Sequence, residues 1–369
     1  MLQQPELLAP AGSLETLKYA VMYGADAVYC ALPEFGMRAA PVNLTVGELH
    51  EGCIFAHARG KKVYLTLNTL PTNEELSKLP RYIQDAAEAG VDAFIIADLG
   101  VLALAKKYAP QVERHVSTQA GITNYEAAKV CYELGAKRVV LARELPLTEI
   151  AQIRDNCPQD LELEAFVHGA MCMSVSGRCL LSNYMTGRDS NRGACAQPCR
   201  YQYALMEEKR PGEYFPVYEE NGETYILNSR DMCMIDHVGE LIDAGLDSLK
   251  IEGRAKSAYY AAIVTGAYRH AIDAAWSGVP LDPVWRDEVE HISHRHYSTG
   301  FYYPEHKVQQ STDRSAYFRA WLVVGEVLSW SPEDGGRVTI MSRNKIEAGQ
   351  EVEFVLPGAA PFAYTVPAG

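Results

Sequence analysis

Four segments of the chain share one pattern: an amphipathic stretch ends in a glycine, and a short apolar run follows at once. The runs read GADAVYCAL from Gly24, GVDAFIIAD from Gly90, GAKRVVLAR from Gly135 and GLDSLKIEG from Gly245. Glycine suits the left-handed backbone position that ends a helix. An apolar run of this length is typical of a parallel strand that is buried on both faces. The pattern therefore predicts repeated helix–glycine–strand units in an α/β protein.

Counting the apolar segments gives eight candidate strands, which is the number that closes a (β/α)8 barrel. The candidates are residues 6–9, 27–31, 63–67, 93–97, 113–118, 138–142, 163–167 and 248–251. An open, doubly wound sheet is the alternative fold. No GxGxxG motif follows the first candidate strand, so a dinucleotide-binding sheet has little support. We therefore predict a TIM-like barrel.

The predicted barrel covers residues 1–275 and includes a cysteine-rich insertion at about 168–235, between the seventh and eighth strands. Residues 276–315 are predicted to be an irregular connector. The short β segments WLVVGEVLSW, GRVTIMS and EVEFVL then predict a small β-barrel-like domain over residues 316–369, which we expect to be truncated.

The charge and the N-terminal sequence limit the function classes. The formal net charge of −13 argues against binding nucleic acid over a broad surface, which is usually basic. No apolar run is long enough to span a bilayer, and the N-terminus lacks the basic and apolar regions of a signal peptide. We therefore expect a cytoplasmic protein without membrane contact, whose thiols stay reduced. The sequence does not indicate an oligomeric state.

Residues 168–204 are locally basic in this acidic chain. Their charged residues include four arginines and only one carboxylate, Asp189; the arginines are Arg178, Arg188, Arg192 and Arg200. Either these arginines are solvated or paired with carboxylates elsewhere, or they bind an anionic partner. The sequence leaves both interpretations open.

Polar side chains follow several of the candidate strands. Because the active site of a barrel lies at the C-terminal ends of its strands, these side chains should meet on one face. Any one of them could be a cap or a surface residue, so the set is more informative than a single member. The set comprises Asn68, Asp98, Gln119, Arg143, Glu144, His168, Glu252 and Arg254.

Residues 168–200 hold four of the nine cysteines, Cys172, Cys179, Cys195 and Cys199, and Cys233 lies near the end of the insertion. Three interpretations stay open from spacing alone: reduced thiols without metal, a structural zinc site, or an iron–sulfur cluster. Zinc sites usually show tight C-x2-4-C pairs, and only Cys195 to Cys199 fits that spacing. Clusters need four thiolates at looser spacing, so a cluster is modestly favoured. The remaining cysteines are predicted to be structural.

A cysteine peptidase is a further hypothesis, because His168 and Cys172 are close in sequence and a thiol nucleophile needs a nearby base. That spacing is weak evidence by itself. No HExxH motif indicates a metallopeptidase.

The segment HGAMCMSVSGRCLLSNYMTGRDSNRGACAQPCRYQY resembles the signature of the collagenase-like peptidase family. ELLAPAGSLETLKYAVMYGADAVY, VSTQ and LKIEGR are also similar to that family. The resemblance spans residues 1 to about 310, and the β tail fits the family's C-terminal domain. Within the family, the chain looks most like the proteins that hydroxylate tRNA.

The family label implies proteolysis, whereas its RNA-acting members imply oxygen-independent hydroxylation with a 4Fe–4S cluster and prephenate as the hydroxyl source. The resemblance implies tRNA as partner and conversion of the wobble uridine to 5-hydroxyuridine. A collagenase-like peptidase, a hydroxylase of ribosomal RNA and a tRNA-binding module without turnover are the alternatives. By the same resemblance, the cluster ligands are Cys172, Cys179, Cys195 and Cys233, with zinc as the alternative metal and Cys199 as an extra thiol.

We predict three catalytic side chains, His168, Glu252 and Arg254. We also predict a substrate-binding set consisting of Asn68, Gln119, Arg143 and Arg178. A carboxylate-bearing donor would suit Arg143 or Arg254, since guanidinium binds carboxylate in a bidentate way. Three tyrosines of the insertion either stack on an unpaired base or pack ordinarily; they are Tyr184, Tyr201 and Tyr203.

Overall fold

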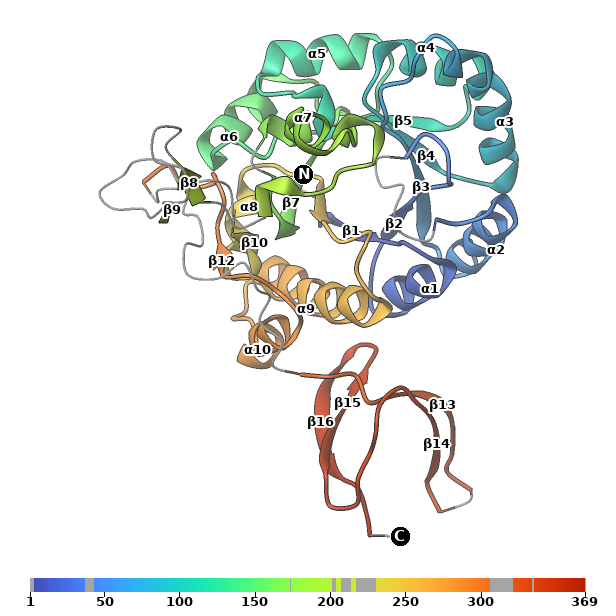
Figure 1. Ribbon diagram of the computed structural model, residues 1–369, viewed down its shortest axis with the longest axis vertical. Helices are drawn as coiled ribbons and strands as arrows, with labels where there is room; N and C mark the ends of the chain where they lie inside the picture. The colour runs from blue at the N-terminus through green and yellow to red at the C-terminus, as the bar shows by residue number, and fades with distance from the viewer. Residues whose placement is uncertain are drawn as a thin grey trace.

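The computed structural model describes residues 3–36, 43–172, 174–200, 204–206, 214–216, 230–305, 321–333 and 335–368. Eight parallel strands form a closed barrel, because β11 pairs with both β1 and β7 (Figure 1). The barrel strands are β1 (Glu6–Pro10), β2 (Ala27–Cys30), β3 (Lys62–Leu67), β4 (Ala93–Ile96), β5 (Glu113–Val116), β6 (Arg138–Val140), β7 (Glu162–Ala170) and β11 (Ser248–Ile251). The predicted TIM-like barrel and its eight strands are confirmed.

Helices form a ring outside the barrel (Figure 1). They are α1 (Leu14–Met22), α2 (Val46–His57), α3 (Leu79–Ala89), α4 (Leu99–Tyr108), α5 (Tyr125–Glu133), α6 (Leu147–Asn156), α8 (Val238–Asp243) and α9 (Ala258–Ser277). The glycines that follow four of them have positive φ angles of 106°, 100°, 95° and 82°, at Gly24, Gly90, Gly135 and Gly245. A side chain is disfavoured there, which explains why each unit turns from helix to strand at glycine.

Apolar side chains fill the layer between helices and strands, and a charged network fills part of the barrel interior. The guanidinium of Arg138 lies 2.6 Å from the carboxylate of Glu6 and 2.9 Å from that of Glu164. Lys250 Nζ lies 2.8 Å from the other oxygen of Glu164. Burial raises the pKa of the Glu6 carboxyl, but Arg138 outweighs burial and lowers it to about 2. The network is therefore ionised and paired.

The insertion begins later than the sequence indicated, because β7 continues through His168 to Ala170. Strand β10 (Asp231–Cys233) pairs antiparallel with this extension, and Cys233 lies opposite His168. Helix α7 (Leu181–Thr186) and the short strands β8 (Ala204–Met206) and β9 (Tyr214–Pro216) also belong to the insertion. His168 is thus a strand residue, whereas we had predicted it to lie past the strand end.

Helix α10 (Pro283–His291) lies where we had predicted an irregular connector. Strand β12 (Tyr297–Ser298) follows it and pairs with β10. Arg295 lies 2.6 Å from Asp231 of β10, and both side chains are buried. The segment therefore packs against the insertion, and residues 306–315 lie outside the described part.

The C-terminal region contains two antiparallel hairpins, β13 (Gly325–Ser331) with β14 (Arg337–Ser342), and β15 (Glu351–Leu356) with β16 (Ala359–Thr365). Within residues 321–333 and 335–368, these four strands form two separate two-stranded sheets. The barrel-like form of the domain therefore stays a prediction. Tyr23, which directly follows α1, donates a hydrogen bond to the Val355 carbonyl at 3.0 Å. Within the described residues, no helix has the length and apolar character to cross a bilayer.

We expect Arg138→Leu to lower the free energy of unfolding by about 3–5 kcal/mol, because it leaves buried carboxylates without their cation. Arg81→Leu is the control, since Arg81 forms an exposed pair with Asp85 and should contribute only about 0–1 kcal/mol. Urea unfolding followed by circular dichroism measures both variants. Equal losses in the two variants would contradict a structural role for the network.

Candidate functional site

The cysteine-rich segment is fastened to loops that follow the barrel strands, and Figure 1 shows α7 over the ring. Glu144, which follows β6, accepts hydrogen bonds from the backbone amide and the hydroxyl of Ser176 at 2.7 and 2.9 Å. Arg178 donates to the backbone carbonyl of Gln119, which follows β5, at 2.5 Å. Both contacts lie between Cys172 and Cys179. The barrel loops therefore fix the first half of the segment.

A third contact fixes the second half. Arg192 forms a bidentate ion pair with Glu75, and one of the two N–O distances is 3.0 Å. Glu75 lies in the region that follows β3. The hydrogen bond with Arg192 is the largest cause that lowers the pKa of this carboxyl, to about 2. Arg192 lies three residues before Cys195. One arginine of the basic segment is therefore held by a carboxylate, whereas Arg178 is held by a carbonyl.

Backbone amides point at three of the predicted ligand sulfurs, each from two residues further along the chain. The amides of Leu181 and Gln197 lie 3.3 Å from the Sγ atoms of Cys179 and Cys195. The Ile235 amide likewise donates to Cys233, although burial dominates and raises the pKa of that thiol to about 11. Such donors favour the thiolate form that binds metal. The four proposed ligands, Cys172, Cys179, Cys195 and Cys233, are free thiols.

The residues therefore fit a thiolate-bound iron–sulfur group. Three amide donors are already aimed at sulfur, and hydrogen bonds to sulfur are among the features that tune such clusters. A single zinc ion would bring four sulfurs within about 4 Å of one another, given a Zn–S bond of about 2.3 Å. Among the described residues, only Glu288, His291 and Glu353 bring three potential ligand atoms within 4.8 Å of one another. The cysteines are thus spaced more widely than a zinc site requires.

Three predicted substrate-binding residues line one narrow crevice, which has no room for a water molecule. Asn68, Gln119 and Arg178 surround it together with Leu70 and Asn191. The Oε1 atom of Gln119 is buried, and no hydrogen bond reaches it within the described residues. The Gln119 amide and the Arg178 guanidinium therefore lie together beside the cysteine-rich segment.

The other predicted residues form two separate contacts. Arg143 lies 3.2 Å from the carboxylate of Glu252, and its guanidinium stacks over the ring of Phe166 at 3.9 Å. Arg254 is buried, and it donates to the Thr66 hydroxyl at 2.8 Å. Both arginines are thus positioned by neighbours, as a preorganised anion site requires.

His168 lies in a different environment. Its ring is buried, and the rings of Tyr260, Tyr268 and Tyr297 lie 6.1, 5.4 and 5.3 Å away. Burial lowers the pKa of the imidazole to about 3, so the ring is neutral near pH 7. No hydrogen bond within the described residues joins it to Cys172. The nucleophile–base pair of a cysteine peptidase is therefore not formed at these two residues.

Tyr184 is 91% exposed, so its ring is available for contact with a partner. Tyr201 and Tyr203 lie outside the described residues.

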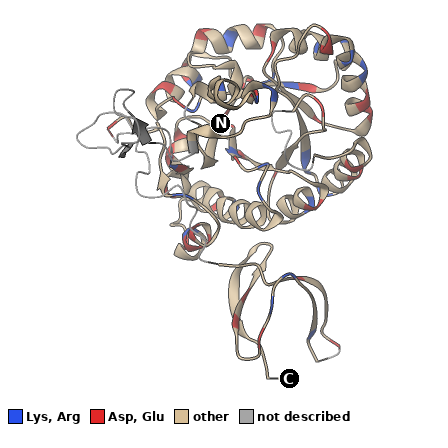
Figure 2. Cartoon of the chain, in the orientation of Figure 1, with Lys and Arg blue, Asp and Glu red and all other residues tan. Residues whose placement is uncertain are grey.

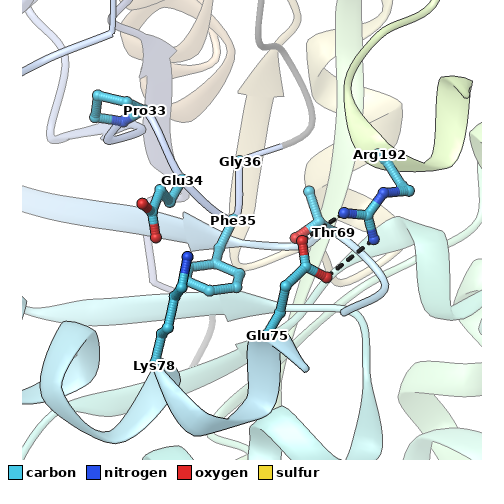
Figure 3. Close-up of a pocket in the computed structure, with 8 residues that line it drawn as sticks. All are labelled: Pro33, Glu34, Phe35, Gly36, Thr69, Glu75, Lys78 and Arg192. Atoms are coloured by element: carbon cyan, nitrogen blue, oxygen red, sulfur yellow. Dashed lines mark hydrogen bonds and ion pairs between the residues drawn. The ribbon is translucent and has the colours of Figure 1, made fainter. Parts of the chain in front are cut away.

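A cavity of about 300 Å³ is the feature that the sequence analysis missed. Figure 3 shows it between the loop after β2, the region after β3 and Arg192. No motif marks its residues, because they come from three separate segments. The lining comprises Pro33, Glu34, Phe35, Gly36, Thr69, Glu75, Lys78 and Arg192.

A closed (β/α)8 barrel that carries thiols over the C-terminal ends of its strands defines the class of this protein. The chain belongs to peptidase family U32: the family description "Peptidase family U32" matches residues 12–312, and "Peptidase family U32 C-terminal domain" matches residues 319–368. This confirms the resemblance seen in the sequence.

Three relatives show the range of names in the family. The chain is 39% identical to tRNA hydroxylation protein P1 of Bacillus subtilis, covering 99% of this chain and 86% of the relative. It is 40% identical to an Escherichia coli 5-hydroxycytidine synthase of 23S rRNA, and the match covers 73% of this chain and 39% of the relative. It is 31% identical to a collagenase of Porphyromonas gingivalis, and the match covers 95% of this chain and 86% of the relative.

We expect Glu144→Ala to loosen the segment between Cys172 and Cys179, because two hydrogen bonds to a carboxylate are lost. The free energy of unfolding should fall by about 1–3 kcal/mol. In metal-free protein, both thiols should be alkylated faster, as measured by mass spectrometry of the labelled peptides. Glu133→Ala, at an exposed position of α5, should leave the labelling rate unchanged. Unchanged labelling in Glu144→Ala would show that this contact does not hold the segment.

Proposed function

We propose that this protein hydroxylates RNA, and that its substrate is the wobble uridine of tRNA, which becomes 5-hydroxyuridine. The observation that carries the proposal is the set of amide donors aimed at cysteine sulfurs, beside the polar side chains of Gln119 and Arg178. The names of the Bacillus and Escherichia coli relatives support RNA as the substrate class. An unpaired anticodon base can reach such a site without first leaving a duplex.

We propose that Cys172, Cys179, Cys195 and Cys233 hold a 4Fe–4S cluster. When bound, the cluster supplies redox chemistry at the C-terminal face of the barrel. The amides of Leu181, Gln197 and Ile235 would offset the negative charge of the thiolates. The backbone of Cys179 is also fixed, because its amide and carbonyl both bond to the Asn191 side chain, at 3.2 and 3.0 Å.

A carboxylate-bearing hydroxyl donor such as prephenate would bind to the arginines of the barrel mouth. Arg254 is a buried guanidinium, so it can bind a carboxylate in surroundings that screen charge weakly. Arg143 is already paired with Glu252, and a donor carboxylate would have to compete with that pair. Arg143 and Arg254 are therefore the two candidate sites for the donor.

We expect anaerobically purified protein to form 5-hydroxyuridine when it is incubated with tRNA lacking that modification and with prephenate. Nucleoside mass spectrometry detects the product, and omission of prephenate is the control. Product on 23S rRNA but not on tRNA would favour the ribosomal alternative. Cleavage of gelatin without any hydroxylated nucleoside would overturn the proposal and favour the peptidase named among the relatives.

We expect about four iron atoms and four sulfides per chain after anaerobic reconstitution. Serine at any of the four proposed ligand positions should remove most of this iron, because each thiolate holds one corner of the cluster. Cys199→Ser should retain the iron, and Cys157→Ser in the buried core is the matched control. Iron loss in Cys199→Ser with retention in Cys195→Ser would instead assign Cys199 as the ligand.

A further inference from the structure

The cavity shown in Figure 3 adjoins the proposed cluster site, yet neither the cysteines nor the mouth arginines Arg143 and Arg254 form its lining. Arg192 is one wall, and Cys195 follows it by three residues. Gly36 is another wall, and a Cβ atom there would lie 3.4 Å from the Arg254 guanidinium and 3.4 Å from the Thr66 hydroxyl. The cavity therefore lies between the cysteine-rich segment and the arginine at the barrel mouth.

Phe35 is fixed within this cavity. Its φ angle of 61° is left-handed, a conformation that a bulky residue adopts only when its surroundings hold it there. The Tyr82 hydroxyl donates to the carbonyl of Glu34 at 2.7 Å, and the Thr69 amide donates to that of Phe35 at 3.3 Å. The Phe35 ring packs edge-on against Tyr82, with ring centres 5.0 Å apart. The ring is thus positioned before any ligand arrives.

The charges of the lining cancel. Lys78 and Arg192 contribute two cations, and Glu34 and Glu75 contribute two carboxylates. Arg192 and Glu75 are paired directly with each other. A dicarboxylate would find no excess positive charge here, so this cavity suits a neutral ligand. An aromatic ring with polar groups around it suits a flat heterocycle.

We propose that this cavity binds an unpaired nucleobase of the RNA substrate, with Phe35 as the stacking surface. This inference rests on the proposed function and specifies where the base enters. The polar atoms of Thr69 and Glu34 are available in the lining to contact the edge of the base. The exposed Lys78 lies at the same cavity, where it can contact the backbone phosphate. The base would then lie beside the segment that carries Cys195.

Photo-crosslinking tests the assignment without requiring a loaded cluster. An anticodon stem-loop with 5-bromouridine at the wobble position is irradiated with the full-length protein, and the crosslinked peptide is identified by mass spectrometry. We expect the crosslink within residues 33–36. Phe35→Ala should weaken stem-loop binding by about 5- to 150-fold, the range for losing one base–aromatic stack.

Two variants separate stacking from misfolding. Phe35→Tyr keeps a ring and should restore binding and crosslinking. Phe55→Ala removes a half-buried phenylalanine on α2, outside the cavity, and should bind as the unchanged protein does. A crosslink elsewhere, or unchanged affinity in Phe35→Ala, would overturn the pocket assignment, even if tRNA is still hydroxylated. Absence of hydroxylated product under reconstituted conditions would count against the proposed function instead.

Discussion

The barrel depends on a buried charge network that joins six of its eight strands. Arg138 of β6 binds carboxylates of β1 and β7, and Lys250 of β11 binds the same β7 carboxylate. Tyr64 of β3 donates to Glu6 at 2.6 Å, and the ring of His115 in β5 packs edge-on against that tyrosine. Removing one member would leave buried charge without a partner, so the strands are constrained together.

Two members of this network, Glu6 and Arg138, are the first residues of β1 and β6, and the others lie within their strands. The polar residues of the candidate site follow the opposite ends of the strands. Stability and chemistry are therefore separated along the barrel axis, as they are in other barrels. The loops after the strands can hold the cysteine-rich segment while the charge network below remains intact.

The sequence predicted the barrel well because glycine and buried apolar runs are local signals. The turn at Gly90, for example, needs only the left-handed backbone conformation of its own glycine. The extension of β7 was not predictable in this way, because His168 becomes a strand residue only when β10 pairs beside it. The cavity around Phe35 was missed for the same reason: Arg192 is more than 100 residues away from Glu75 in the chain. Tertiary pairing decides both features.

The two neighbouring sites differ in charge, which indicates that they bind different ligands. Arg254 is buried against Thr66, so an anion there gains from weak screening. The cavity around Phe35 carries cancelling charges and a fixed ring, so an anion gains little and a flat neutral group gains more. Because Gly36 brings the cavity wall close to Arg254, the two ligands would bind side by side. A carboxylate donor and an uncharged base could thus occupy adjacent sites without competing for the same cation.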